Sequence, residues 1–172
     1  MLYVSTAQLR RHQQKAGTCY DSESVDTFCT TVEYKHKGML SFIRQGAVYS
    51  TFEWWTMEIA SGETVAAMVV VRDEGVLVLQ HMAVCSGDRH KGLGTKMIDA
   101  IRTEVGTIIL STIGERATDF FKTRGFDIRK DVRQQVLAEF GLGIESLEGA
   151  EFMASGPIST SKFHRLAMKH RM

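Results

Sequence analysis

A run of basic and glycine residues in the middle of the chain has the composition of an anion-binding loop. The segment Arg89–Gly94 reads RHKGLG. Its basic side chains would add a positive field, and a glycine without a Cβ lets a phosphate approach the backbone closely. The alternative is a plain connection with solvated charges, because short glycine motifs also occur by chance. The run lacks the Gly-Lys-Ser/Thr ending of a P-loop and the third glycine of a dinucleotide fingerprint.

A predicted strand and a predicted helix flank this loop. The strand Val76–Val84 is almost entirely apolar, as buried strands are, and Ser86–Asp88 has the composition of a turn. At the start of the helix, backbone amides without intrahelical partners and the helix dipole would face the loop. The apolar residues that form one face of this predicted helix are Leu93, Met97, Ile98, Ile101 and Val105.

Two motifs in order resemble those of the GNAT acetyltransferase superfamily. Arg89-x-x-Gly92-x-Gly94, preceded by Met82-Ala83-Val84, looks like the family's coenzyme A signature, Gln/Arg-x-x-Gly-x-Gly/Ala. Downstream, ATDFFKTRGF at residues 117–126 resembles the family's helix that ends in a Gly-Phe pair before the next strand. The similarity is strongest over residues 63–126 and thin over the first forty.

The resemblance implies an α/β (α+β) fold in a single domain over residues 1–172. Its sheet would be mixed, mostly antiparallel and twisted, splayed at Val76–Val84, with helices on both faces. The sequence predicts a helix over Val25–Arg44. It also predicts strands over Ala47–Ala60, Thr64–Arg72 and Gly106–Ser111.

The last third of the chain departs from the family pattern. Thr112–Glu115 is predicted as a loop, and Asp127–Val132 as the start of a strand. Gln134–Gly156 is predicted to be a long insertion, whose residues Val136, Leu137, Phe140 and Leu142 could make a short amphipathic helix. Phe163–Met172 alternates loosely and resembles the family's terminal strand.

By the resemblance, acetyl-CoA would be the donor and a primary amine the acceptor, with direct transfer in a ternary complex. The acceptor could be a polyamine-like molecule, an amino sugar, or a protein lysine or N-terminus. Backbone groups of Met82, Ala83 and Val84 would bind the pantetheine arm, and Arg89 would order the turn. The amides assigned to the pyrophosphate are those of His90, Lys91, Gly92, Leu93, Gly94 and Thr95.

The usual proton carriers are missing from the matched positions. Phe121 stands where many members have a tyrosine as general acid, and phenylalanine has no proton to give. Gly114 replaces the asparagine often found seven residues earlier, and Val78 replaces the glutamate of histone-type members. A CoA thiolate, with a pKa comparable to the ~8.5 of cysteine, can also leave without an acid.

Substitutes for these proton carriers lie nearby in the sequence. The histidine side chain has an ordinary pKa of ~6.5, so His81 could act as the base. Glu58 could also act as the base. Ser111 or Thr112 could donate a proton to the thiolate. Each residue also has a purely structural interpretation: a strand histidine, an exposed carboxylate, a hydroxyl bonded to the backbone. Cys85 suggests a route in which the acetyl group is first transferred to the enzyme. Direct transfer is favoured, because the resembled family uses it and because a single cysteine commonly serves as a small apolar packing residue.

Composition limits the remaining function classes. The chain has 172 residues, 44% hydrophobic content and a formal net charge of +1, which gives no argument for a nucleic-acid or membrane partner and argues weakly against a highly cationic acceptor. Cys19, Cys29 and Cys85 are widely spaced, so reduced thiols and no metal site are expected. We see no signal peptide or membrane span and expect a cytoplasmic protein. Homodimers are common in the resembled family.

Two rival functions remain at this point. The first is a catalytically weak or inactive GNAT-fold module that binds CoA or nothing and regulates a partner protein. Phe121, Gly114 and the predicted insertion motivate it. The second is a nucleotide-binding domain of another strand–helix type, against which the downstream Gly125-Phe126 pair argues.

Overall fold

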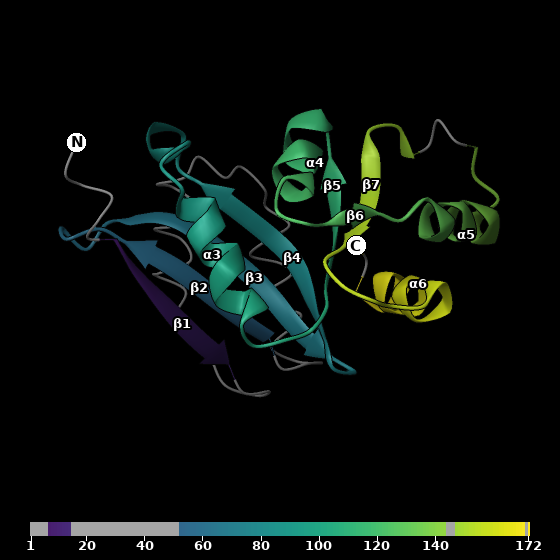
Figure 1. Cartoon of the computed structure of the whole chain (residues 1–172), viewed down its shortest axis with the longest axis horizontal. Helices are drawn as coiled ribbons and strands as arrows, with labels where there is room; N and C mark the ends of the chain where they lie inside the picture. Colours follow the sequence, from purple (N-terminus) through teal and green to yellow (C-terminus); the bar gives the residue numbers. More distant parts are fainter. Residues whose placement is uncertain (1–6, 15–51, 144–146, 171) are drawn as a thin grey trace. The chain divides into compact units, whose positions relative to one another are not determined.

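Strand β4 (Val76–Val84), which leads into the basic loop, has the bounds that the sequence predicts. The structure is a computed structural model, and it describes residues 7–14, 52–143, 147–170 and 172. Around it the described residues form six further strands and four α-helices (Figure 1). These are β1 (Gln8–Gln14), β2 (Phe52–Glu58), β3 (Thr64–Asp73), α3 (Leu93–Arg102), β5 (Ile108–Ile113), α4 (Glu115–Lys122), β6 (Asp127–Ile128), α5 (Lys130–Phe140), β7 (Ala150–Ala154) and α6 (Thr160–Lys169).

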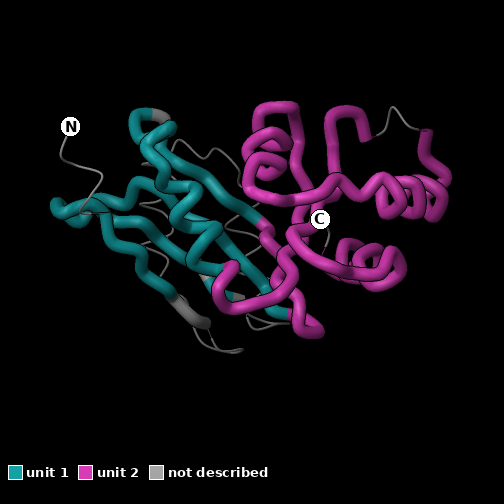
Figure 2. Tube along the Cα trace, in the orientation of Figure 1, with its two compact units in different colours: residues 1–72, 81–101 teal, residues 73–80, 102–172 magenta. Residues whose placement is uncertain are grey.

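The strands follow the order β1-β2-β3-β4-β5-β7-β6. The pairs β1/β2, β2/β3, β5/β7 and β6/β7 are antiparallel, whereas β4/β5 is parallel. The predicted α/β class with a mixed, mostly antiparallel sheet is therefore confirmed. By its contacts the chain divides into two compact units, residues 1–72 with 81–101 and residues 73–80 with 102–172 (Figure 2). The expected single domain stays a prediction.

The first unit contains β1, β2, β3 up to Arg72, the end of β4 from His81, and helix α3 up to Ile101. β3 is buried from Thr64 to Val71, as its run of valine, alanine and methionine predicts. The predicted stripe of α3 is confirmed within the helix, because Leu93, Met97, Ile98 and Ile101 are all buried. Val105 lies beyond the helix end at Arg102.

The second unit contains the start of β4 and the strands and helices that follow α3. β4 pairs in parallel with β5 from Leu77↔Ile108 to Leu79↔Leu110. β5 pairs on its other side with β7, from Ile109↔Ala154 to Ile113↔Ala150. Helices α5 and α6 pack against one another.

Several predicted element bounds are wrong by a few residues. β2 begins at Phe52 and ends at Glu58, so Ile59 and Ala60 are not in the strand predicted over Ala47–Ala60. β5 is displaced toward the C-terminus and includes Thr112 and Ile113, which were predicted as loop. Residues 47–51 and the predicted helix Val25–Arg44 lie outside the described residues.

Two strands predicted in the last third are wrong in kind, whereas the short helix predicted there is confirmed in part. Only Asp127–Ile128 of the strand predicted over Asp127–Val132 is extended, because α5 begins at Lys130. The segment Gln134–Gly156, whose status as an insertion stays a prediction, contains most of α5 and all of β7, which pairs with both β5 and β6. Of the four residues assigned there to an amphipathic face, Val136 and Leu137 are buried, whereas Phe140 and Leu142 are exposed.

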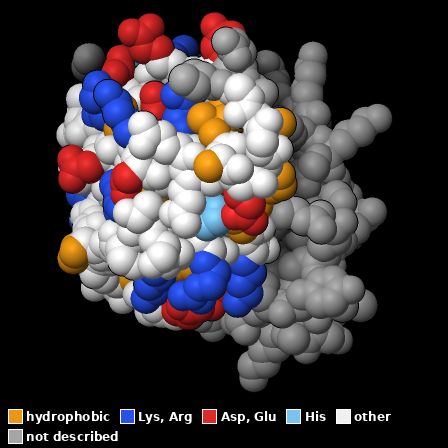
Figure 3. Space-filling model, turned by 90° about the vertical axis from the view of Figure 1, so that its right-hand side faces the viewer, with side chains coloured by type: hydrophobic (Ala, Val, Ile, Leu, Met, Phe, Trp, Pro, Cys, Tyr) orange, Lys and Arg blue, Asp and Glu red, His pale blue; other side chains and the backbone are white. Residues whose placement is uncertain are grey.

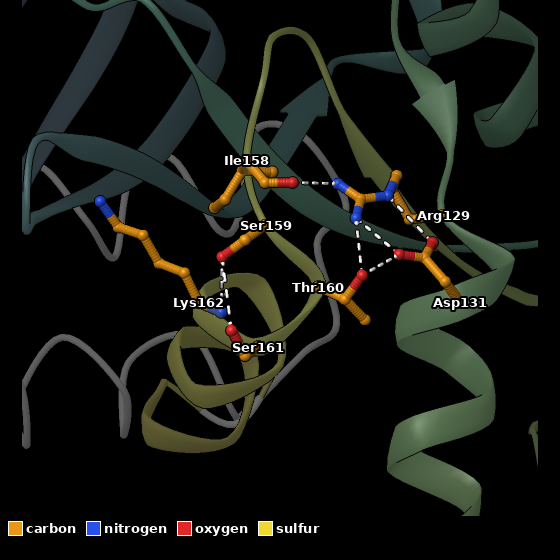
Figure 4. Close-up of polar contacts among 7 residues, drawn as sticks. All are labelled: Arg129, Asp131, Ile158, Ser159, Thr160, Ser161 and Lys162. Carbon is orange, nitrogen blue, oxygen red and sulfur yellow. Dashed lines mark hydrogen bonds and ion pairs between the residues drawn. The ribbon is translucent and has the colours of Figure 1, made fainter.

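The predicted terminal strand Phe163–Met172 is instead helix α6. Phe163, Leu166 and Ala167 are its buried residues, and their spacing is that of a helix face. Ser159 caps the helix by accepting a hydrogen bond from the Lys162 amide at 3.3 Å (Figure 4). This cap and the helical spacing outweigh the loose alternation of polar and apolar residues.

The guanidinium of Arg129 connects the start of α5 to the segment before α6. It forms a bidentate pair with Asp131, with N–O distances of 2.9 and 2.6 Å, and donates to the Ile158 carbonyl at 2.8 Å (Figure 4). The Arg129 guanidinium holds the pKa of Asp131 far below its ordinary value. These contacts fix the segment that leads to the Ser159 cap.

The basic side chains of α6 pair with acidic residues at the β3–β4 turn. Asp73 Oδ2 accepts from Lys169 Nζ at 2.6 Å and lies 2.7 Å from His170 Nε2, and Arg165 pairs with Glu74. Figure 3 shows basic side chains next to acidic ones on one face of the molecule. Among the described residues, the basic side chains of Lys169 and Arg165 are therefore paired with acidic side chains of the same unit.

None of the helices in the described part of the chain is both long and apolar enough to span a bilayer.

Candidate functional site

The residues predicted to bind the cofactor follow one another through a strand end, a loop and a helix start. Met82, Ala83 and Val84 end β4, and each is partly exposed, whereas Val76–Leu79 at the start of the strand are buried. The pairing of β4 with β5 covers Leu77–Leu79, and β4 then continues to Val84. The predicted splay of this strand stays a prediction.

The loop is tied together by its own backbone and side chains. After Val84, residues Ser86–Asp88 form a single 3₁₀ turn, in which the Asp88 amide donates to the Cys85 carbonyl at 2.9 Å. Arg89 Nε donates to the Val84 carbonyl at 3.2 Å. Lys91 Nζ pairs with Asp88 Oδ1 at 2.7 Å.

Two residues of the loop adopt the left-handed backbone conformation. His90 has φ 65° and Gly92 has φ 78°. This conformation costs a residue with a side chain roughly 1–2 kcal/mol, but glycine adopts it freely. A Cβ built on Gly92 would meet no other atom within 4 Å, so the space beside this glycine is open.

The first turn of α3 directly follows the glycine. Lys96 N donates to the Gly92 carbonyl at 3.0 Å and starts the helical ladder. The amides of Leu93 and Gly94 precede that bond and point out of the helix start, where the dipole favours an anion. The side chain of Leu93 is buried, which anchors this end of the helix.

His81 and Glu58, the two predicted proton acceptors, belong to the same unit as the loop. His81 is partly exposed on β4, one residue before Met82. Glu58 ends β2 at a β-bulge and pairs with Thr64, and the next residue, Val65, accepts from the Cys85 amide at 2.8 Å. Glu58 therefore lies at the end of the sheet where β4 enters the loop.

The Glu58 carboxylate pairs with Arg10, at 2.9 Å from Nε to Oε2. Sequence reasoning did not identify Arg10, because β1 (QLRRHQQ) is a polar strand without apolar alternation. Its antiparallel register, with Gln8 opposite Glu58, brings Arg10 into reach. A partner at this distance would compete with a substrate ammonium for the carboxylate.

Glu53, also on β2, has a contrasting environment. Its side chain is only 3% exposed and lies 2.6 Å from Arg72 Nε and 2.5 Å from Arg11 Nη2. Burial by itself would raise the pKa of Glu53, but the hydrogen bonds and charges of Arg72 and Arg11 outweigh it and lower the pKa. Glu53 is thus a structural anion that does not suit the role of base.

Ser111 and Thr112 belong to the second unit, and they differ in what their hydroxyls can do. Thr118 Oγ1 donates its single proton to the Gly114 carbonyl at 3.1 Å. Thr112 Oγ1, 2.7 Å from Thr118 Oγ1, must therefore be the donor of that contact. The Thr112 proton is thus used inside the fold, whereas Ser111 is exposed.

Phe121, at the family's tyrosine position, is a packing residue of the second unit. Its ring is 8% exposed and makes edge-to-face contacts with Phe120 at 5.0 Å and Phe126 at 5.3 Å. Phe120 is more exposed, as expected for adjacent residues that cannot both face inward. Phe121 therefore has neither the proton nor the exposure of a general acid.

No protein-family model matches the chain, and no curated protein matches it. Solved structures do. An acetyltransferase of the GNAT family from Staphylococcus aureus Mu50 is 17% identical with a TM-score of 0.57, over 86% of this chain and 98% of that one. A putative GNAT-family acetyltransferase from Bacteroides thetaiotaomicron is 13% identical with a TM-score of 0.58, over 92% and 96%.

A third similar structure is the PaiA N-acetyltransferase from Thermoplasma acidophilum in complex with coenzyme A. It is 10% identical with a TM-score of 0.53, over 86% of this chain and 99% of that one. At these identities the likeness concerns the fold. The chain has the fold of the GNAT acetyltransferases, and the resemblance first carried by Arg89–Gly94 and Gly125-Phe126 is confirmed at that level.

Proposed function

We propose that this chain is an N-acetyltransferase that binds acetyl-CoA and transfers its acetyl group to a primary amine. The observation that carries the proposal is the continuous segment Met82–Thr95. It joins a partly exposed strand end, a left-handed glycine with open space beside it, and the amides of a helix start. The GNAT fold of the chain supports the same function.

The residues present fit a coenzyme A group. The backbone of Met82–Val84 lies past the last residue that pairs with β5 and could bond to the amides of a pantetheine arm. The amides of His90–Thr95 would hold the pyrophosphate at the start of α3. Lys91 adds less charge than the sequence suggests, because Asp88 already pairs with it.

Bound acetyl-CoA supplies an activated thioester. The amine must lose a proton before it attacks, and the chain offers two acceptors for that proton, His81 and Glu58. Glu58 would have to exchange Arg10 for the substrate or act through water. Ser111, in the second unit, stays a predicted donor for the departing thiolate, whereas the Thr112 hydroxyl is paired with Thr118.

A thiol-release assay tests the catalytic part of the proposal. The protein is incubated with acetyl-CoA and, in turn, a polyamine, an amino sugar and a lysine peptide, and free CoA is measured. We expect release that depends on one class of amine. His81→Gln and Glu58→Gln would then identify the base, because the variant that lacks it should lose kcat while KM for acetyl-CoA is kept.

The rival function is a GNAT-fold module that regulates a partner, with little or no catalysis. The buried, hydroxyl-free ring of Phe121 favours it. Binding of acetyl-CoA without thiol release for any amine class would support this rival over the enzyme.

A further inference from the structure

Glu58 and Arg10 form an ion pair whose two members differ in exposure. The side chain of Glu58 is 19% exposed, whereas that of Arg10 is 59% exposed. The contact joins Arg10 Nε to Glu58 Oε2 at 2.9 Å, and the other carboxylate oxygen, Oε1, lies 3.4 Å from the Thr56 hydroxyl. A carboxylate that is largely buried needs a cation beside it, so a molecule that displaces Arg10 from Glu58 must supply a positive charge.

The guanidinium of Arg10 has more donors than this contact uses. Because the contact with Glu58 is made through Nε, the edge formed by the two Nη groups can donate to a second anion. That edge matches the two oxygens of a carboxylate, with which arginine forms paired, charge-assisted hydrogen bonds. The exposure of the Arg10 side chain makes it accessible to a small molecule from solvent.

The pair of Arg11 and Glu53 on the same two strands lacks these properties. Successive side chains of a strand point to opposite faces, so Arg10 and Arg11 lie on opposite faces of β1. The Glu53 side chain is 3% exposed and contacts both Arg11 and Arg72, which closes it to a ligand cation. The open pair is therefore Arg10 with Glu58, at the end of the sheet where β4 enters the loop.

An acceptor that carries both charges fits the open pair better than a plain amine. An ammonium that takes the place of Arg10 at Glu58 leaves the guanidinium without its counter-ion. A carboxylate on the same molecule would replace that counter-ion, so all four charges stay paired. Because Arg10 and Glu58 are in contact, the amine and the carboxylate of the acceptor must also be close together, as they are in an α-amino acid.

We propose that Glu58 and Arg10 form an acceptor subsite for α-amino acids, in which Glu58 holds the amine and the Nη groups of Arg10 bind the carboxylate. The assignment rests on the proposed function, because the amine beside Glu58 is the one that would be acetylated. It names an acceptor class that the sequence did not suggest.

Thiol release with matched acceptors tests the preference. Each pair consists of an amino acid and the amine that remains without its carboxylate: alanine and ethylamine, serine and ethanolamine, phenylalanine and phenethylamine, histidine and histamine. In every pair that gives release, we expect kcat/KM for the amino acid to exceed that for the amine about tenfold to a hundredfold, the range for hydrogen bonds to charged groups. Equal use of both members, or release only with amines that lack a carboxylate, would overturn the proposal.

Two variants separate the carboxylate contact from the ion pair. Glutamine carries its Nε2 the same number of bonds from Cα as arginine carries Nε, so Arg10→Gln can still donate to Glu58 but lacks the Nη groups. It should lower kcat/KM for the amino acid to about that for the amine, and should not lower the value for the amine. Arg10→Lys keeps the charge without the planar edge and should retain part of the preference. An unchanged preference in Arg10→Gln would contradict the proposal.

Binding measured without turnover separates this proposal from the proposed function. The N–H signals of the protein are followed by NMR during titration with the same acceptor pairs, with and without CoA. We expect at least one amino acid to bind about tenfold or more tightly than its amine, and Arg10→Gln to remove the difference. Equal binding of both members, or no binding of any amino acid, would overturn the proposal. Binding that depends on Arg10 in a protein that releases no thiol with any amine would refute the acetyltransferase and leave the amino acid site in place.

Discussion

Within the described residues the chain passes twice from a strand through a left-handed glycine into a helix, and the two connections differ in the partners of their polar groups. Between β4 and α3 the connection covers residues 85–92 and includes Gly92 with φ 78°. Between β5 and α4 it is the single residue Gly114, with φ 90°.

The backbone polar groups of the short connection form hydrogen bonds within the fold. Gly114 N donates to the Gly149 carbonyl at 2.8 Å, and the Gly114 carbonyl accepts from both the amide and the hydroxyl of Thr118. The long connection places backbone amides ahead of α3 and ties its ends with Arg89 and Lys91. A strand–glycine–helix pattern therefore does not by itself indicate a ligand site; the length of the connection and the partners of its polar groups decide.

The largest effect is expected for Gly92→Val. A β-branched residue at φ 78° is strained, and its side chain would project into the open space beside the loop. We predict that binding of acetyl-CoA, measured by calorimetry, weakens by at least about tenfold. Gly87→Val is the matched control in the same loop, since a Cβ there is unobstructed and its φ is not left-handed. An equal loss in the control would refute the special role of Gly92.

Gly114→Ala should act on stability and leave binding unchanged. The new Cβ meets no atom within 4 Å, so the cost is the backbone conformation alone, φ 90° and ψ 150°, which is essentially restricted to glycine. We predict a decrease of about 1–3 kcal/mol in the free energy of unfolding, measured with denaturant. Weakened CoA binding in a protein of unchanged stability would reverse the assignment of the two connections.

The hydroxyl pair of Thr112 and Thr118, which lie on either side of the short connection, provides a third test. Thr118→Val leaves the buried Thr112 hydroxyl without its acceptor and should cost about 1–2 kcal/mol of stability. The double variant Thr112→Val with Thr118→Val removes both hydroxyls and should recover most of that loss. Additive losses in the double variant would show that the two hydroxyls do not act as a pair.

Lys91→Met should have the smallest effect. Its ion pair with Asp88 is largely exposed, and such pairs contribute about 0–1 kcal/mol to stability. Because Asp88 already offsets the Lys91 charge, we expect less than about a threefold loss in CoA affinity, well below that of Gly92→Val. A loss as large as that of Gly92→Val would mean that side-chain charge, and not the backbone, holds the anion.

The sequence predicts best where local pattern and tertiary structure agree. β4, β3 and α3 follow from apolar runs and helical spacing, and the loop between β4 and α3 follows from its glycines. The polar strand β1 could not be predicted, because its residues become a strand only by pairing with β2. For the same reason the sequence pattern does not predict β7, which becomes a strand by pairing with β5 and β6.

The candidate site divides in a similar way. The positions of Met82–Thr95 are local and could be predicted, as could the likeness to GNAT acetyltransferases. The pairing of Glu58 with Arg10, and the use of the Thr112 proton by Thr118, depend on residues distant in sequence or on a helix register. Both contacts reduce the number of candidate proton carriers. Neither contact can be inferred from a sequence pattern.

The central claim is tested most directly by calorimetric titration of the purified protein with acetyl-CoA, with ATP and NAD as controls. We predict micromolar binding of acetyl-CoA and CoA, without comparable binding of ATP or NAD. Absence of acetyl-CoA binding, or a preference for ATP, would contradict it and would leave Arg89–Gly94 as a structural turn or as a different nucleotide site.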